Sequence, residues 1–528
     1  METLRIWPQL HPELSLRIAS FLPANEVACS LRMVNIAAAK LLSGPRHATV
    51  RLSQPSPPHA FAAQWAAPGA IRRLTLNQRK QLLALTAASG CVPNLELVAS
   101  RVGFPPTHHA LEAASAGGQL EACQWLLLHG CHPTGSALAA AAAGGHTAVY
   151  ERLLGHGAQW DGFGVFAALQ RGYTGDAEVW MRAHPEELEQ CTSIVVAAAE
   201  GCDLAALQRM YDWFTSPEGL ARDGGGAAEA FREWEWGEIL DAAAASSTAD
   251  WRAKVEWLES RGHGPAQASC SGVSRRPDAV ERLRWLRPRG YRPSSAVVDV
   301  VASCGNMAAL EYLLSEGADA RGASTTMTAM AGQLDCLRVL WAAGADLAGD
   351  VGSAAAGGHL HVVAWLVEEA GQAAQLDGGA VFAEAARSGS VELMSWLRQR
   401  GVAMDATVFL AAVESGCEEA MAWLVEQGCP LPASDAAFMA AFRLVDLVDV
   451  ASLRCLPRVG CPWPAGFLTL ALRSRGPSVR DLRALLAAGC PVTRGDVVEA
   501  AAYVRESYWE ERSDMLALLT ELDPTMRE

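Results

Sequence analysis

The sequence predicts an all-α solenoid of stacked helical repeats, and three observations support this prediction. A frame recurs in which small residues precede a glycine, a leucine follows eight positions later, and a second glycine follows twelve positions later. Successive frame glycines lie 26 to 31 residues apart, a length that suits one pair of helices. Charged residues make up 19% of the 528 residues and hydrophobic residues 50%, as in a folded helical protein. Self-similarity at a fixed period of this size is typical of stacked repeats.

The repeat frame gives a structural role to a set of glycines and leucines. The alanine-rich segment before each frame glycine predicts a first helix, and apolar residues at helical spacing after it predict a second. Glycine between them tolerates the left-handed backbone of a tight turn, and the next glycine ends the second helix in the same way. The structural repeat positions are Gly118, Gly145, Gly305, Gly332, Gly358, Gly389, Gly416, Leu126, Leu366, Leu397 and Leu424.

The first 42 residues lie outside this frame and predict a small module of three helices. Apolar residues at helical spacing run from Leu14 to Leu22, and Pro23 ends that segment. A second apolar helical pattern includes Val27 and Val34. Taken alone, the pattern is compatible with an N-terminal cap for the solenoid.

Composition divides the rest of the chain into a connector, a repeat array and a cap. The proline-containing segment 43–80 predicts a connector, and residues 81–522 predict about 14–15 repeats. The period is irregular at 211–237, where Trp234 and Trp236 flank a glutamate and are candidate partner-binding residues. The alternative is that these rings fold back on the stack. The charged segment 501–528 predicts a polar C-terminal cap.

The repeats resemble ankyrin repeats. The stretch from Ala354 to Leu366 is similar to the second-helix signature of that family, and Gly317-Ala-Asp319 is similar to its end. The ankyrin unit has roughly 33 residues and a Thr-Pro-Leu-His opening, whereas most units here are shorter and lack that opening. The resemblance therefore implies an ankyrin-type solenoid with shortened or absent β-hairpin fingers, which binds a target protein on its concave face.

The N-terminal module has the residue order Leu10-x-Pro-Glu-Leu14, Ile18, Phe21-Leu22-Pro23 and Leu31-Arg-x-Val34-Asn35. This order resembles an F-box, which implies docking on a Skp1-like adaptor of a cullin ubiquitin ligase. Its departure is Ala38, where the family usually has tryptophan. The resemblance implies a substrate-recruiting adaptor. The alternative hypothesis is an ankyrin scaffold without a ubiquitin role, in which the N-terminal helices are only a cap. Residues implied as adaptor contacts are Leu10, Pro12, Leu14, Ile18, Leu22 and Val34.

The sequence predicts neither catalysis nor a cofactor or metal. It contains no phosphate-binding loop, nucleophile elbow, HExxH motif or zinc-type spacing of cysteine and histidine. The net charge of -15 argues against nucleic acid as the main partner, and the arginine-rich run 275–292 fits a solvated helix face. The fourteen scattered cysteines predict reduced intracellular thiols. With no signal peptide and no membrane-spanning run, we expect a cytoplasmic or nuclear protein that is monomeric outside its complexes.

Overall fold

The fold is described from a computed structural model of the chain. It describes residues 11–67, 69–185, 191–216, 233–264, 270–291, 295–376, 379–442, 448–475, 478–506 and 512–522. The regular elements in these ranges are all helices, which confirms the predicted all-α repeat solenoid. None of the helices in these ranges combines the length and apolar character that crossing a bilayer requires.

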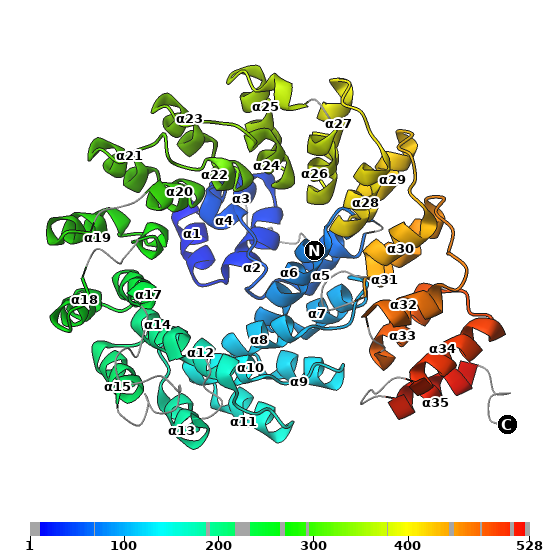
Figure 1. Cartoon of the computed structure of the whole chain (residues 1–528), viewed down its shortest axis with the longest axis horizontal. Coiled ribbons are helices and arrows are strands. Elements are labelled where there is room, and N and C mark those ends of the chain that lie inside the picture. The colour runs from blue at the N-terminus through cyan, green and yellow to red at the C-terminus, as the bar shows by residue number, and fades with distance from the viewer. Residues whose placement is uncertain are drawn as a thin grey trace, which may run out of the picture. The chain divides into compact units, whose positions relative to one another are not determined.

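Contacts divide the chain into two compact units. Unit 1 comprises Met1–Ala70, Lys80–Arg101 and Pro105–Arg292. Unit 2 comprises Ile71–Arg79, Val102–Phe104 and Pro293–Glu528. Each unit is a stack of helix pairs, whose labels follow Figure 1.

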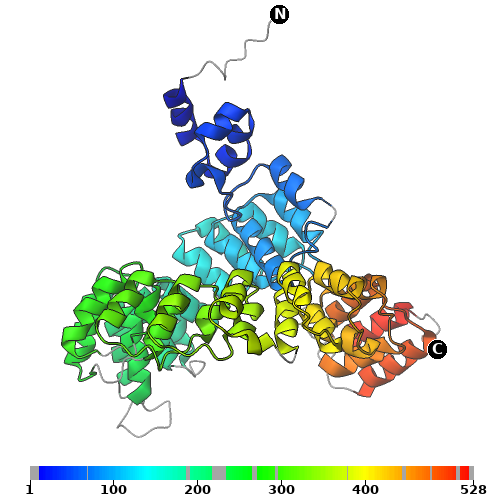
Figure 2. The ribbon, with the colours of Figure 1, turned by 90° about the horizontal axis from the view of Figure 1, so that it is seen from above.

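Unit 1 begins with a module of short helices around a small apolar core. Ala19, Val27 and Leu42 are buried there, and Leu31 packs against them. Figure 2 shows these helices in dark blue. The helices up to the first repeat are α1 (Pro12–Ser20), α2 (Ala24–Cys29), η2 (Leu31–Met33), α3 (Ile36–Leu41), α4 (Pro45–Ala48) and α5 (Pro58–Trp65).

The repeats follow as pairs of a first and a second helix. Neighbouring first helices contact one another, as α8, α10, α12, α14 and α17 do in succession. The pair α6 (Leu76–Ala88) and α7 (Val92–Ala99) begins in unit 2 and continues in unit 1. The other pairs of unit 1 are α8 (His108–Ala116) and α9 (Leu120–Leu128), α10 (Gly135–Ala143) and α11 (Thr147–Gly155), α12 (Gly162–Gln170) and α13 (Gly175–Ala183), α14 (Cys191–Gly201) and α15 (Leu204–Thr215), α17 (Glu233–Ala244) and α18 (Trp251–Ser260), and η5 (Gly272–Arg275) and α19 (Ala279–Leu286) followed by η6 (Arg287–Arg289).

Unit 2 continues the same arrangement, and its first helices also contact one another in succession. Its pairs are α20 (Ser295–Ser303) and α21 (Met307–Ser315), α22 (Thr326–Met330) and α23 (Leu334–Ala342), α24 (Asp350–Ala356) and α25 (Leu360–Glu368) followed by η7 (Ala373–Leu376), α26 (Ala380–Ser388) and α27 (Val391–Gln399), α28 (Ala406–Ser415) and α29 (Glu418–Glu426), α30 (Ser434–Phe442) and α31 (Val450–Arg458), α32 (Phe467–Arg475) and α33 (Val479–Ala488), and α34 (Arg494–Glu506) and α35 (Arg512–Leu522).

The frame glycines close the repeat turns as the sequence predicts. Gly145 has φ +70°, and the following His146 N–H donates to the Ala141 carbonyl at 2.9 Å. At the end of the second helix, Gly157 has φ +85° and the Ala158 N–H donates to the Leu153 carbonyl at 3.1 Å. The frame leucine therefore has two roles, because its side chain is buried and its carbonyl accepts this closing bond. The seven predicted turn glycines all have positive φ.

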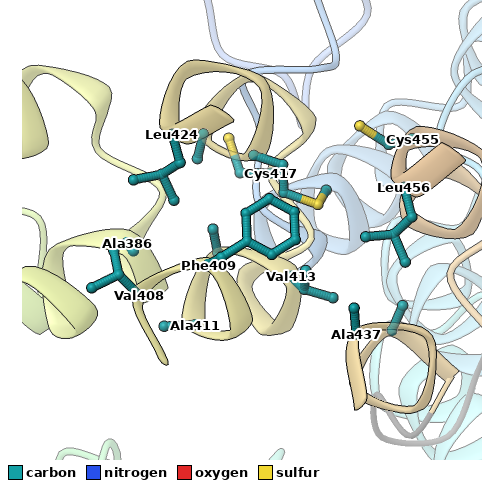
Figure 3. Packing of buried hydrophobic residues seen from close by; sticks show 14 of the residues in the cluster. Ala386, Val408, Phe409, Ala411, Val413, Cys417, Leu424, Ala437, Cys455 and Leu456 are labelled. Carbon is teal, nitrogen blue, oxygen red and sulfur yellow. The ribbon is translucent and has the colours of Figure 1, made fainter. Parts of the chain in front are cut away.

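In unit 2, first helices rich in small residues and apolar second helices together form a continuous hydrophobic core. Phe409 of α28 lies close to Val413, Cys417 and Leu424, and all four side chains are buried (Figure 3). Leu126, Leu366 and Leu397 occupy corresponding buried positions in their own repeats. A side chain at the frame leucine position thus bridges two neighbouring helix pairs, which no isolated pair can provide.

Within residues 191–291, buried cations bond the last carbonyl groups of a repeat's first helix, where the regular repeats have a left-handed glycine turn. Lys254 of α18 donates from Nζ to the carbonyls of Ala199 and Cys202 and to the Ser246 hydroxyl. Arg282 of α19 donates from Nη1 to the carbonyl oxygen of Ala244 at 2.7 Å and that of Ser246 at 2.9 Å. These cations bond carbonyl groups in the last turn of α14 and α17 or just after it, as helix C-termini require.

Candidate docking surface

Helix α1 turns its small residues inward and its large apolar residues outward. Ser15 and Ala19, four residues apart, are buried against the module. Leu14 and Ile18, also four residues apart, are 51% and 39% exposed. Residues spaced by four lie on one helix face, so α1 offers an apolar face to solvent. A helix that served only to cap the stack would bury that face.

Other segments of the module also expose large apolar side chains. Phe21 directly follows α1 and is 78% exposed, while Met33 of η2 and Ile36 of α3 are exposed to a similar degree. Single exposed apolar residues are ordinary, but a concentration of large ones marks an interaction site. We call this set the apolar face. It comprises Leu14, Leu16, Ile18, Phe21, Leu22, Met33, Val34 and Ile36.

A hollow of about 340 Å³ opens beside the apolar face. Leu16 and Leu22 belong to both the face and the wall of the hollow, and Val27 lies at its inner side. Arg46 and His47 of α4 line the same hollow. The hollow thus combines an apolar wall with a cationic rim.

The module also differs from the rest of the chain in charge. Residues 11–50 contain four basic and two acidic residues, whereas the whole chain has a net charge of -15. Within the module, Ser30 Oγ and Arg32 Nε are buried without a hydrogen-bond partner. Buried polar atoms normally have such partners.

The module is held in place by two buried asparagines. The Asn25 side chain donates to the Arg51 carbonyl and the Ser56 hydroxyl, both at 2.8 Å, and accepts from the Arg51 N–H at 2.8 Å. Asn94 of α7 donates to the Ser56 carbonyl at 2.9 Å. Segment 51–56, which the sequence places in a connector, is therefore fixed on both sides.

The structure leaves five of the six predicted N-terminal site residues exposed. Pro12, Leu14, Ile18, Leu22 and Val34 are all exposed, and Leu10 lies outside the described residues. Sequence reasoning did not include Phe21, Met33 and Ile36 among the site residues. The signal for them was weak, because a large apolar residue next to Pro23 or Val34 fits a buried position equally well.

The second predicted site lies in the irregular segment. The Trp236 ring stacks on His263 with ring centroids 3.4 Å apart and lies 5.7 Å from the Tyr211 ring. The side chain of Trp234 is outside the described part of the chain. At Trp236 the arrangement matches the alternative in which the ring folds back on the stack.

Two titratable groups with altered pKa values, Lys254 and Tyr150, have structural partners. Burial lowers the pKa of Lys254 to about 8, while Asp250 acts in the opposite direction. Burial raises the pKa of Tyr150 to about 12, and the hydroxyl donates to Asp176. Within the described ranges, no three or more histidine, cysteine or acidic residues gather in a way that could hold a metal ion.

Comparisons with known proteins assign no family. No family model and no curated protein matches the sequence. Among solved structures, the chain is similar to the pentatricopeptide repeat protein PPR10 in complex with an 18-nt psaJ RNA element, and to a cysteine-to-serine variant of the same complex. In both cases the identity is 13%, the match covers 97% of this chain and 92% of the other, and the TM-score is 0.23. A likeness at this level assigns no function to this chain.

The ankyrin and F-box assignments are wrong by these comparisons. The solved structures found are pentatricopeptide repeat proteins, and no family model matches either part of the chain. The adaptor role in a ubiquitin ligase and the ankyrin-scaffold alternative fall with them. The physical reason is that first helices rich in small residues, glycine turns and buried leucines occur in any fold of stacked helix pairs. Leucine, proline and isoleucine at helical spacing likewise serve any short amphipathic helix.

The prediction of protein partners without nucleic acid is also corrected. The solved structures found contain a helical-repeat protein with bound RNA. A net charge summed over the whole chain does not fix the charge of each surface. As the N-terminal module demonstrates, local charge can have the opposite sign to the total.

Proposed function

We propose that this chain is a non-catalytic attachment protein whose N-terminal module docks on another polypeptide through the apolar face. The observation that carries the proposal is the orientation of α1, with Ser15 and Ala19 buried and Leu14 and Ile18 exposed. The proposal concerns this module alone and includes no role in ubiquitin transfer.

The chemistry of the face selects the kind of partner. Aliphatic side chains gain about 1.5–3 kcal/mol each when they are fully buried against another apolar surface. The basic excess of the module and the Arg46 and His47 rim favour acidic groups around that surface. The expected partner is therefore a protein with an apolar groove or helix and an acidic border.

The non-catalytic part of the proposal is supported by how the described buried polar groups are used. Lys254 and Arg282 bond backbone carbonyls near helix ends, and Arg79 forms a buried ion pair with Asp449. Each of these contacts holds one helix pair against another segment. The packing of helix pairs therefore accounts for the burial of these charged side chains.

A photo-crosslinking experiment with the full-length chain tests the docking. The photoreactive analogue of phenylalanine is placed at Phe21 or, as the matched control, at Phe163 of α12. The two side chains are 78% and 81% exposed and both lie in unit 1. We expect crosslinks to one defined acidic polypeptide from position 21 and none to that polypeptide from position 163.

The double substitution Ile18→Asp and Val34→Asp should abolish the crosslink, because buried unpaired carboxylates oppose docking. Leu128→Asp, at an 81% exposed site on α9, should leave it unchanged. The proposal fails if position 21 crosslinks only to lipid or to a second copy of the chain. It also fails if both positions capture the same proteins.

A further inference from the structure

Unit 2 contains an ion pair between residues that are 370 positions apart in the sequence. The Arg79 side chain is 2% exposed and the Asp449 side chain is fully buried. Arg79 Nη1 donates to Asp449 Oδ1 at 2.9 Å, and Nη2 donates to Oδ2 at 2.6 Å. This two-point geometry fixes both the distance and the orientation of the two segments.

Both charged groups have further partners. Arg79 also donates to the carbonyls of Val102 and Gly416. The Asp449 carboxylate accepts from the Ser452 hydroxyl at 2.6 Å and caps α31 by accepting from the Ala451 N–H at 3.2 Å. Removing the guanidinium would leave a buried carboxylate without its cation, which is strongly unfavourable.

Two backbone contacts reinforce the ion pair. The Glu419 N–H at the start of α29 donates to the Arg72 carbonyl at 3.1 Å. The Val450 N–H at the start of α31 donates to the Gly103 carbonyl at 3.0 Å. The first N–H groups of a helix have no partner within the helix, and residues from the beginning of the chain supply one here.

Gly103 permits the closest approach. Its φ is +80°, and a Cβ at this position would lie 2.5 Å from the Ala451 Cβ and 3.0 Å from the Ala451 nitrogen. A side chain would therefore separate the two segments. The Gly416 turn is covered in the same way, since a Cβ there would lie 2.8 Å from Arg79 Nη2 and 3.0 Å from the Leu76 Cβ.

We propose that residues 71–79 and 102–104 together form a strap that closes over the repeat turns at Gly416 and Asp449, and that its contacts with both turns break in one event. Arg79 is the central contact of the strap, because its guanidinium bonds Val102 of the strap as well as Gly416 and Asp449 of the repeats. Opening exposes the Gly416 carbonyl and the N-termini of α29 and α31 together.

The strap changes how local unfolding spreads within unit 2. In a one-dimensional array each repeat contacts only its neighbours, so loss of order spreads from repeat to repeat. The strap instead links the start of the chain directly to α29 and α31. Protection of these two regions against hydrogen exchange should therefore rise and fall together.

Hydrogen exchange measured on the full-length chain tests the proposal with two pairs of variants. Arg79→Met should accelerate exchange about tenfold in both the strap and residues 448–456, since both open in the same event. Its control is Arg400→Met, which removes an exposed ion pair with Glu368 in the same unit. The control should leave both regions unchanged.

Gly103→Ala keeps Arg79 intact and decides the question if Arg79→Met unfolds. Its control is Gly428→Ala, because Gly428 has a similar φ of +77° but no atom within 4 Å of the added methyl group. Faster exchange of residues 448–456 in Gly103→Ala alone supports the strap. Equal exchange there in both glycine variants, or a change confined to the strap, overturns it.

Discussion

The regular repeats and residues 191–291 differ in how the first helix of a repeat is completed. In the regular repeats, a glycine such as Gly145 takes a left-handed conformation, and backbone N–H groups bond the last carbonyls. In the irregular region, the ends of α14 and α17 receive the side chains of Lys254 and Arg282. The same requirement is therefore met by backbone in one region and by buried cations in the other.

The two solutions use the same position of the second helix. Lys254 and Arg282 are each the fourth residue of their helix, where the regular repeats have apolar residues such as Leu310, Leu337 and Met394. The comparison teaches that a missing turn glycine can be offset by one cation from the second helix of the next repeat. A buried cation tolerates loss of its partners poorly, so we expect the irregular region to be the less tolerant of substitution.

The largest expected effect is at Lys254. Lys254→Met should destabilise the protein by about 3–5 kcal/mol, because two carbonyls and a hydroxyl lose a charged donor in a buried site. Urea unfolding measures the change. Leu337→Met at the matched position of α23 should cost less than about 1.5 kcal/mol. Similar losses in the two variants would show that the buried cation has no special role.

The next effect concerns the core of a regular repeat. Leu397→Ala should cost about 2–5 kcal/mol, because the side chain is fully buried. Hydrogen exchange should increase in the neighbouring repeats of unit 2, since stability in a stacked array is mainly local. Uniform loss of protection that extends through unit 1 would contradict this expectation.

Asp350 gives the regular region a buried charge of its own. It stands at a position where other repeats have Ala137 or Val381, and burial, with a smaller contribution from the Asp346 charge, raises the pKa of its carboxyl to about 6. The folded chain therefore holds the proton more tightly than the unfolded chain. Stability should fall as the pH rises from about 4 to about 6, by at most about 1.4 kcal/mol per pH unit.

Asp350→Asn should remove this pH dependence and be the more stable protein above pH 6. The difference in unfolding free energy between the two proteins, measured from pH 4 to pH 8, isolates the contribution of Asp350 from that of other carboxyl groups. A constant difference across this range would mean that Asp350 does not titrate there.

The smallest effect should come from the exposed ion pairs between repeats. Arg400→Ala removes the contact with Glu368 and the stacking over Trp396. Because both charged side chains remain solvated, the cost should be at most about 1 kcal/mol and should decrease with added salt. A larger, salt-independent loss would indicate that surface contacts contribute as much as the buried ones.

Local signals explain what could be predicted from the sequence. Gly118, Gly145 and Leu397 act through hydrogen bonds and packing within one repeat or its neighbour, so their spacing alone reveals their roles. The N-terminal residues Leu14 and Ile18 became candidate site residues through the resemblance to an F-box, and their spacing of four places them on one helix face. Their exposure was not predictable from that spacing, since a buried cap would have the same pattern.

The family assignments failed for a related reason. The features used for them are general requirements of stacked helix pairs and small amphipathic helices, and they do not distinguish one repeat family from another. The roles of Lys254 and Arg282 were missed because their carbonyl acceptors lie 36 to 55 residues away along the chain. Nothing in the local sequence distinguishes a buried lysine from a solvated one.

By itself, the sequence determined that this chain forms repeated helix pairs, because glycine conformation, helical periodicity and apolar burial act over a few residues. Only the tertiary structure decided which faces stay exposed on the N-terminal module, which cations enter the core, and that Arg79 meets Asp449. Those outcomes depend on contacts between distant segments. Such contacts arise from the stacking of whole helices, and the residue order near each partner does not specify them.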